Sequence, residues 1–119
     1  MNVENSIPTP DELARRLAWH DEHPASDDLA TRARPLRCPC CGCNTISKRM
    51  MYEICPVCCW EDDGQDEHNA EDVRGGANGL LSLLEARQNY LKYGACSQER
   101  LAFVRPAVAG EVPPGSDDE

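Results

Sequence analysis

Apolar and polar positions at the start of the chain predict helices. Over residues 9–20, Thr9 is suited to cap a helix, Glu12 can close a capping box, and an apolar stripe at helical spacing begins at Leu13. Residues 26–33 begin with a capping serine followed by acidic side chains, which predicts a second, shorter helix. The N-terminal section is therefore expected to be a helical arm.

The clearest helical pattern lies in the second half of the chain, over residues 83–93. Ser82 and Glu85 have the spacing of a capping box, and Gly94 stands where a helix commonly ends. A further short helix is predicted over 97–103 before a proline interrupts the chain. These patterns place the regular helices on both sides of a central segment without helical periodicity.

The central segment predicts a short hairpin. Between residues 44 and 53 and just beyond, Ile46, Met50, Tyr52 and Ile54 occupy alternating positions, which is typical of strands. Seven of the eight cysteines lie immediately around this hairpin, between residues 38 and 60.

The cysteines form two Cys-x-x-Cys pairs, each with proline after its first cysteine. Tight turns of this kind, called zinc knuckles, direct two sulfur atoms at one metal. Four soft ligands predict one structural Zn²⁺ ion, or iron in a rubredoxin-like site, held by Cys38, Cys41, Cys55 and Cys58.

Other ligand sets remain open at this stage. Cys40 can replace its neighbour by a slip of register, and Cys59 can do the same in the second pair, because adjacent cysteines do not easily face one ion. Cys43 has no assigned role, and Cys96 is expected to be a small buried apolar residue. A second metal at Asp66 and His68 is disfavoured, since no other histidine lies near them in sequence.

Composition supports a metal rather than disulfides. The chain has 119 residues with one Phe, two Trp and three Tyr, so its hydrophobic core is expected to be small and to need a metal ion or disulfides for stability. Its start lacks a signal peptide and no stretch reaches membrane-spanning length, which favours a cytoplasmic location where thiols stay reduced. The expected fold is a small, metal-stabilised α+β domain with zinc-ribbon-like knuckles, a short β-hairpin, C-terminal helices and the N-terminal helical arm.

The formal charge of −9 arises from 12 basic and 21 acidic residues, and a zinc ion with four thiolates would add −2. This balance disfavours nucleic acid and suits a basic protein partner, although acidity can also serve only solubility. Residues 61–72 carry acidic groups and no base and are expected to form a loop. The partner-binding surface is therefore predicted around Trp60, Glu61, Asp62, Asp63, Asp66 and Glu67. For Trp60 itself a core position covering the metal site is favoured, and an anchor at the interface is the alternative.

Three other functions compete with such an interaction module. A thiol redox protein would use Cys40, Cys43 or Cys59, but the surroundings are acidic. A zinc deaminase is disfavoured, because residue 37 is Arg where that signature has Pro, and no other catalytic motif is visible. A nucleic-acid-associated ribbon would need a basic cluster drawn from Arg15, Arg16, Arg32, Arg34, Arg37, Lys48 and Arg49. The sequence therefore predicts a non-enzyme.

Several separated motifs resemble the bacterial cysteine-rich CPCC domain family over about residues 37–106. They are Cys38-Pro-Cys-Cys-Gly42, Tyr52-Glu-Ile-Cys-Pro-Val-Cys58, Trp60-Glu-Asp-Asp63, Gly75-Gly-Ala-Asn-Gly79, Ala86-Arg-Gln-Asn-Tyr90, Tyr93-Gly-Ala-Cys96 and Val104-Arg-Pro106. The resemblance implies a small metal-binding domain in a cytosolic accessory protein, with kinship to immunity proteins that inhibit a toxin or nuclease. Cys43 and Cys59 depart from the family, which more usually has an aromatic residue there.

This resemblance divides the chain into three parts. They are a helical arm over residues 1–36, the cysteine-rich domain over 37–106, and an acidic tail over 107–119 that is expected to be disordered.

Overall fold

The computed structural model describes residues 7–22 and 36–112. Two α-helices, two short strands and four 3₁₀ turns follow one another in the order α1 (Pro10–Glu22), β1 (Leu36–Arg37), β2 (Asn44–Ile46), η2 (Glu67–Asn69), η3 (Gly76–Asn78), α2 (Leu83–Tyr93), η4 (Gln98–Phe103) and η5 (Ala109–Glu111). The predicted helix over residues 26–33 lies outside the described ranges. Neither α-helix within them has the length and apolar content needed to cross a bilayer.

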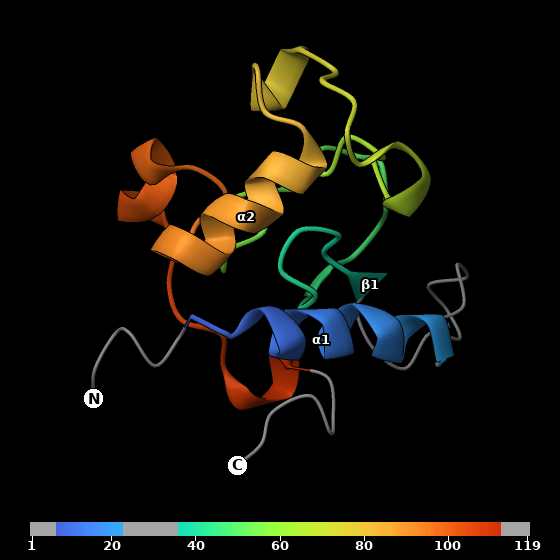
Figure 1. The fold of residues 1–119 in the computed structure, drawn as a ribbon, viewed down its shortest axis with the longest axis vertical. Coiled ribbons are helices and arrows are strands. Elements are labelled where there is room, and N and C mark those ends of the chain that lie inside the picture. The colour runs from blue at the N-terminus through green and yellow to red at the C-terminus, as the bar shows by residue number, and fades with distance from the viewer. Residues whose placement is uncertain (1–6, 23–35, 113–119) are drawn as a thin grey trace.

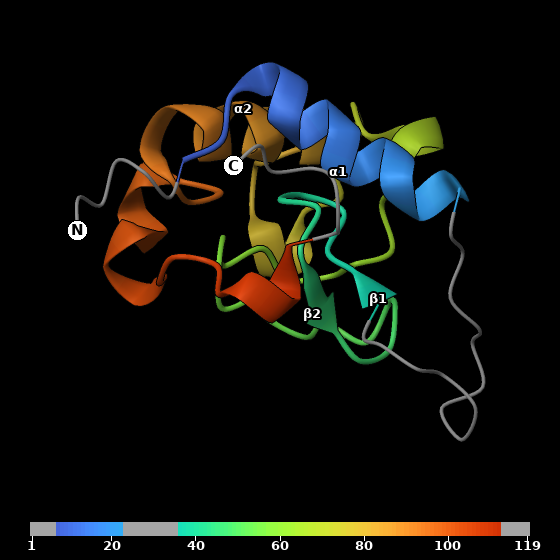
Figure 2. The same cartoon turned by 90° about the horizontal axis from the view of Figure 1, so that it is seen from below.

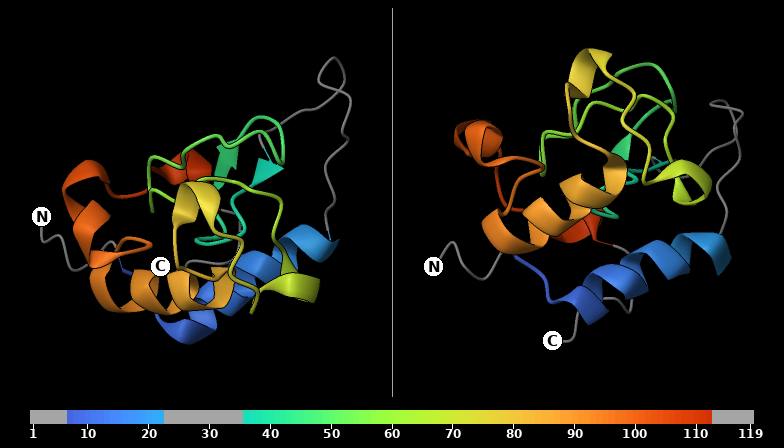
Figure 3. Two further views of the ribbon diagram at one scale, coloured as in Figure 1. Left: turned by 90° about the horizontal axis from the view of Figure 1, so that it is seen from above. Right: turned by 45° about the horizontal axis from the view of Figure 1, so that its top comes forward.

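The two α-helices lie on one side of the molecule and the strands on the other (Figures 2 and 3). The loops that carry the cysteines, coloured blue-green and green, lie near the middle of the molecule (Figure 1). The core is built mostly from these loops, because its buried apolar members are Leu13, Cys38, Cys40, Cys41, Cys43, Ile46, Cys55, Val57, Cys58, Trp60, Ala70, Leu83, Ala86, Tyr90 and Cys96. A core with this many thiols and few large side chains confirms the small α+β class, organised around a cysteine cluster.

Helix α1 begins where its capping box predicts. The Thr9 hydroxyl accepts a hydrogen bond from the Glu12 backbone N–H at 3.1 Å, and the Glu12 carboxylate accepts one from the Thr9 N–H at 3.4 Å. Leu13 and Arg16 bury one face of the helix, each with only 4% of its surface exposed. The helix is therefore part of the core and not a detached arm.

The predicted hairpin over residues 44–53 is wrong. Strand β2 pairs instead with β1, which precedes the first knuckle, in an antiparallel sheet of two strands. Met50 and Tyr52 adopt positive φ angles of 68° and 60°, so the chain turns where a return strand was expected. The alternation of Met50, Tyr52 and Ile54 is real, but these side chains face solvent.

The second half of the chain follows the sequence more closely. Helix α2 has Ser82 as its N-cap, whose hydroxyl accepts from the Glu85 N–H at 3.0 Å, and Gly94 ends it in the left-handed conformation with φ of 91°. Residues 98–103 form a 3₁₀ helix. Described residues of the predicted tail are folded, since Glu111 forms an ion pair with Arg105 at 2.7 Å; residues 113–119 lie outside the described ranges.

Candidate metal centre

Each Cys-x-x-Cys pair sits in a tight loop closed by two backbone hydrogen bonds. In the first knuckle, residues 38–43, the Cys38 N–H donates to the Cys43 carbonyl at 2.8 Å, and the Gly42 N–H donates to the Cys38 carbonyl at 2.9 Å. Strands β1 and β2 lead into and out of this loop. The loop is therefore the tip of a small hairpin.

The second knuckle, residues 55–60, repeats this geometry. The Cys55 N–H donates to the Trp60 carbonyl at 3.0 Å, and the Cys59 N–H donates to the Cys55 carbonyl at 2.8 Å. The flanking chains are again antiparallel, with Ile54 bridged to Glu61. The two loops are thus copies of one turn, Cys-Pro-Cys-Cys-Gly-Cys and Cys-Pro-Val-Cys-Cys-Trp.

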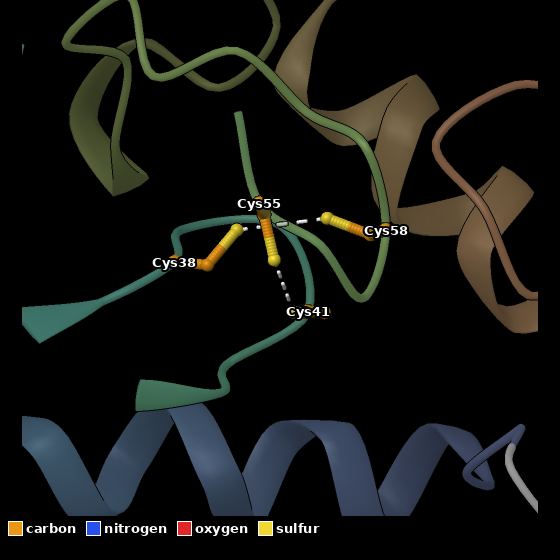
Figure 4. A group of neighbouring side chains, drawn as sticks. All are labelled: Cys38, Cys41, Cys55 and Cys58. Atoms are coloured by element: carbon orange, nitrogen blue, oxygen red, sulfur yellow. Dashed lines mark hydrogen bonds between the residues drawn. The ribbon is translucent and has the colours of Figure 1, made fainter. Parts of the chain in front are cut away.

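The two knuckles bring four sulfur atoms together. One Sγ from each of Cys38, Cys41, Cys55 and Cys58 lies within 4.8 Å of the other three, and Figure 4 shows the four side chains converging from two loops. The Cys38–Cys58 and Cys41–Cys55 sulfur pairs are both separated by 3.6 Å. A tetrahedral ion with bonds of about 2.3 Å to sulfur would hold its ligands about 3.8 Å apart, whereas a disulfide needs about 2.05 Å. The cluster therefore has the spacing of a site for one metal ion.

Burial opposes the ionisation of three of the four clustered thiols. Burial raises the pKa of Cys38 to about 11 and, together with neighbouring thiols, raises the pKa of Cys41 and Cys58 well above the usual range. Burial acts the same way on Cys55, but hydrogen bonds from the other three thiols and from Thr45 outweigh it and hold its pKa well below the usual range. Before a metal binds, the cluster would carry thiolate mainly at Cys55, so metal binding would displace protons from the others.

Polar groups outside the cluster support Cys55. The Thr45 hydroxyl lies 3.0 Å from its sulfur, and the Val57 backbone N–H donates to the same atom at 3.4 Å. The contact from Thr45 was not predicted, because it joins residues ten positions apart, one on β2 and the other in the second knuckle.

The other cysteines of the knuckles are not members of the four-sulfur group. When the sequences of the two loops are aligned, Cys40 corresponds to Val57 and Cys43 corresponds to Trp60. All four of these side chains are buried, so Cys40 and Cys43 act as small core residues. Cys96 is also wholly buried, as expected. The cluster includes Cys41 and Cys58 rather than their neighbours.

Cys59 matches Gly42, and both residues adopt left-handed backbone, with φ of 69° and 77°. The cysteine keeps a conformation that glycine adopts without strain. Its thiol is half-buried, unlike those of the other seven cysteines. Burial raises the pKa of Cys59, although the nearby Arg100 guanidinium opposes the shift.

A buried arginine on α1 connects the first knuckle to α2. The Nη1 atom of Arg16 donates to the Cys41 carbonyl at 3.0 Å and to the Tyr90 hydroxyl at 3.1 Å, and it lies 3.6 Å from the Cys43 sulfur. Burial lowers the pKa of Arg16, but the charge and hydrogen bond of Tyr90 and the charges of Cys43 and Cys41 more than reverse this. Arg16 thus remains a cation beside the first knuckle, a contact that the sequence did not predict.

The predicted partner-binding residues are divided between core and surface. Trp60 and Asp62 are 0% exposed, so neither side chain can form part of a docking surface in this fold. Trp60 takes the core position that the sequence favoured. Asp62 accepts from the Arg49 Nε at 2.8 Å and from the Met50 N–H at 2.9 Å. The Asp62 carboxylate is buried because it accepts hydrogen bonds from the turn at Arg49 and Met50. The pattern of charges in the sequence does not predict this contact.

Two further acidic residues are paired with arginines. Asp66 contacts Arg37 at 2.6 Å and Arg49 at 3.0 Å, while Glu67 forms an ion pair with Arg87 at 2.9 Å. Burial raises the pKa of Asp66, but the Arg49 hydrogen bond and the charges of Arg37 and Arg49 outweigh it and lower the pKa overall. Glu61 and Asp63 are half-buried, and neither forms an ion pair with a described residue.

The same ion pairs occupy two members of the basic cluster considered for nucleic acid. Arg37 pairs with Asp66, Arg49 pairs with Asp62 and Asp66, and a third member, Arg16, is buried. Arg32 and Arg34 lie outside the described ranges. Residues Asp66 and His68 do not form a second metal site, since only the four-cysteine group qualifies within the described part of the chain.

Comparison with known proteins identifies the domain. No curated protein and no solved structure matches the chain. The family model described as cysteine-rich CPCC matches residues 36–111, which is more than half of the 119 residues and includes both knuckles, α2 and η5 but not α1. The chain therefore belongs to the cysteine-rich CPCC family.

Proposed function

We propose that this chain is a non-enzymatic protein stabilised by one structural Zn²⁺ ion, which Cys38, Cys41, Cys55 and Cys58 hold as thiolates. The observation that carries the proposal is that all four cysteines are 0% exposed and all come from this chain. A catalytic zinc ion keeps one position open to water or substrate, whereas four protein sulfurs enclose the ion. Zinc is preferred to iron because a redox-inert ion suits a purely structural site.

Metal analysis of the full chain tests this role. We expect one zinc per chain after purification without added metal, and loss of cooperative unfolding when a strong chelator removes it. Cadmium would restore the fold, because it also accepts four thiolates. A chain that stays folded and cooperative after complete chelation would refute the structural role.

A protein without catalysis acts through its partners, and the charge of this chain favours a basic protein. The zinc-loaded chain would carry the −9 of its side chains and a further −2 from the metal site. An inhibitor of a basic toxin or nuclease, as in immunity proteins, is the most specific form of this proposal. The acidic surface would increase the association rate by electrostatic steering. A partner that binds equally well at low and high salt would contradict the electrostatic part of it.

The competing functions have less support. Burial of Cys40 and Cys43 leaves Cys59 as the accessible candidate for thiol chemistry, and the raised pKa of Cys59 disfavours the reactive thiolate. Nucleic-acid binding would require arginines that are free to meet phosphates, whereas Arg37 and Arg49 are paired with carboxylates. If the protein retains no nucleic acid in a low-salt filter-binding assay, nucleic-acid binding is excluded.

A further inference from the structure

A group of large apolar side chains is exposed on the loop that precedes the second knuckle. The exposed fractions are 63% for Met50, 57% for Met51, 58% for Tyr52 and 57% for Ile54. We call these four residues the apolar loop. Single exposed apolar residues are ordinary, but four within five positions form a contiguous feature of the kind that marks binding surfaces. Methionine and tyrosine are also enriched at protein interfaces.

The apolar loop is held in place by hydrogen bonds to buried Asp62 and to Glu53. A single Asp62 oxygen accepts from the Arg49 Nε and the Met50 N–H, and the Asp62 carbonyl accepts from the Tyr52 N–H at 3.0 Å. On the other side, the Glu53 carboxylate accepts from the Ser47 N–H at 2.8 Å. The loop is therefore preorganised, which lowers the entropy that binding would cost.

The backbone of the loop is strained in a way that exposes its side chains. Met50 and Tyr52 have φ angles of 68° and 60°, and such conformations are strained in residues other than glycine. The Met50 side chain also lies over Gly64, where a Cβ atom would approach its Cγ to 2.9 Å. The fold thus retains two strained residues whose side chains add little to the core, as binding loops often do.

Two carboxylates beside the apolar loop, those of Glu61 and Asp63, form no ion pair with a described residue. Glu61 lies opposite Ile54 in an antiparallel bridge, and Asp63 adjoins Gly64, over which Met50 lies. The deeper Asp62 and Asp66 are neutralised by arginines. Uncompensated negative charge therefore borders an apolar surface.

We infer that the apolar loop docks a segment of a partner protein that combines a large apolar side chain with flanking lysines or arginines. The apolar part would cover the two methionines and Ile54, and the basic groups would meet Glu61 and Asp63. A second copy of this chain is disfavoured, because two such faces bring like charges together on chains that each carry −9. This inference rests on the proposed interaction role and names its surface and the chemistry of its partner.

Selection from a displayed library of random dodecamer peptides tests the inference on the zinc-loaded full chain. The library is depleted first on the double variant Met51→Ser/Ile54→Ser, and enriched peptides are synthesised for titration. We expect enriched sequences to pair Leu, Ile, Phe or Trp with Lys or Arg, and their affinity to fall at least tenfold in the double variant. The control variant Leu80→Ser, which changes a residue 87% exposed outside the loop, should bind with unchanged affinity.

Other outcomes overturn the inference. They are an absence of enriched peptides, enrichment of acidic or uncharged sequences, and equal binding to the double variant. Dimerisation of the unaltered chain in sedimentation velocity, abolished in the double variant, would assign the face to a second copy instead. Both serine variants should retain one zinc per chain and a cooperative thermal transition. A failure of docking with the metal retained therefore leaves the proposed metal role standing.

Discussion

The two knuckles share one backbone design and differ in what surrounds them. Both close with a hydrogen bond from the first cysteine to the sixth residue and another from the fifth residue back to the first. The first knuckle is covered by α1, whose Arg16 reaches the Cys41 carbonyl. The second knuckle is preceded by the exposed apolar loop. The backbone design that the knuckles share would bind the metal. The contact of α1 with the first knuckle contributes to stability, and we propose that the apolar loop before the second knuckle contributes to recognition.

The fifth position of each knuckle shows how the two have diverged. Gly42 and Cys59 both adopt left-handed backbone, and Gly42 in addition lies directly under a side chain of α1. A Cβ atom on Gly42 would come within 2.7 Å of the Arg16 Cβ. The first knuckle therefore needs glycine for both conformation and space, whereas the second needs it for conformation alone and tolerates cysteine.

The largest expected effect is the loss of zinc on replacing a ligand, and it should be the same for the two knuckles. Replacement of Cys38 or Cys55 by serine should abolish stoichiometric zinc binding and cooperative folding to the same degree. Structural zinc contributes about 10–16 kcal/mol in small zinc domains, which exceeds the stability of most small domains. Metal content and circular dichroism measure the result. Cys40→Ala is the matched control and should retain one zinc; its loss of metal would instead favour the alternative register.

The next largest effect is a loss of stability that is specific to the first knuckle. Gly42→Ala should lower the free energy of unfolding by about 3 kcal/mol, because it adds left-handed strain and a clash with α1. Thermal unfolding of the zinc-loaded protein measures the loss. A change below about 1 kcal/mol would mean that α1 does not pack on this loop as described.

Arg16 tests whether α1 supports the metal site. Arg16→Met should cost about 2 kcal/mol, because the Cys41 carbonyl and the Tyr90 hydroxyl lose a charged donor, and it should weaken zinc binding about tenfold. Competition with a chromophoric chelator measures the affinity. Tyr90→Phe, which leaves the contact of Arg16 with Cys41, should reduce stability but leave zinc affinity nearly unchanged. Equal zinc affinity in Arg16→Met would confine the arginine to packing.

The smallest effect has the opposite sign. Cys59→Gly should raise the free energy of unfolding by about 1 kcal/mol, since glycine relieves the left-handed strain. Cys59→Ala retains that strain and should bring no gain. One zinc per chain is expected in both variants, and loss of metal in either would show that Cys59 is a ligand.

Local signals in the sequence predicted much of this fold. The caps at Thr9 and Ser82 located both α-helices, and the Cys-x-x-Cys spacing selected the four cysteines that cluster. These features depend on residues close together in the chain. The packing of α1 on the first knuckle depends on residues far apart, as in the contact from Arg16 to Tyr90.

The errors have physical causes of the same kind. Alternating apolar residues were taken for a strand, but positive φ angles at Met50 and Tyr52 turn the chain and expose them. Asp62 was placed on the surface because it lies in an acidic run, whereas tertiary contacts bury it. Trp60 takes the core position that the sequence favoured, and it matches buried Cys43 of the first knuckle.

X-ray absorption at the zinc edge of the full chain tests the central claim most directly. The account predicts one zinc ion with four sulfur neighbours at about 2.3 Å and no oxygen or nitrogen in its first coordination sphere. Three sulfurs with a lighter atom would indicate an open, potentially catalytic site. That result would contradict the conclusion that two equivalent knuckles enclose a structural ion.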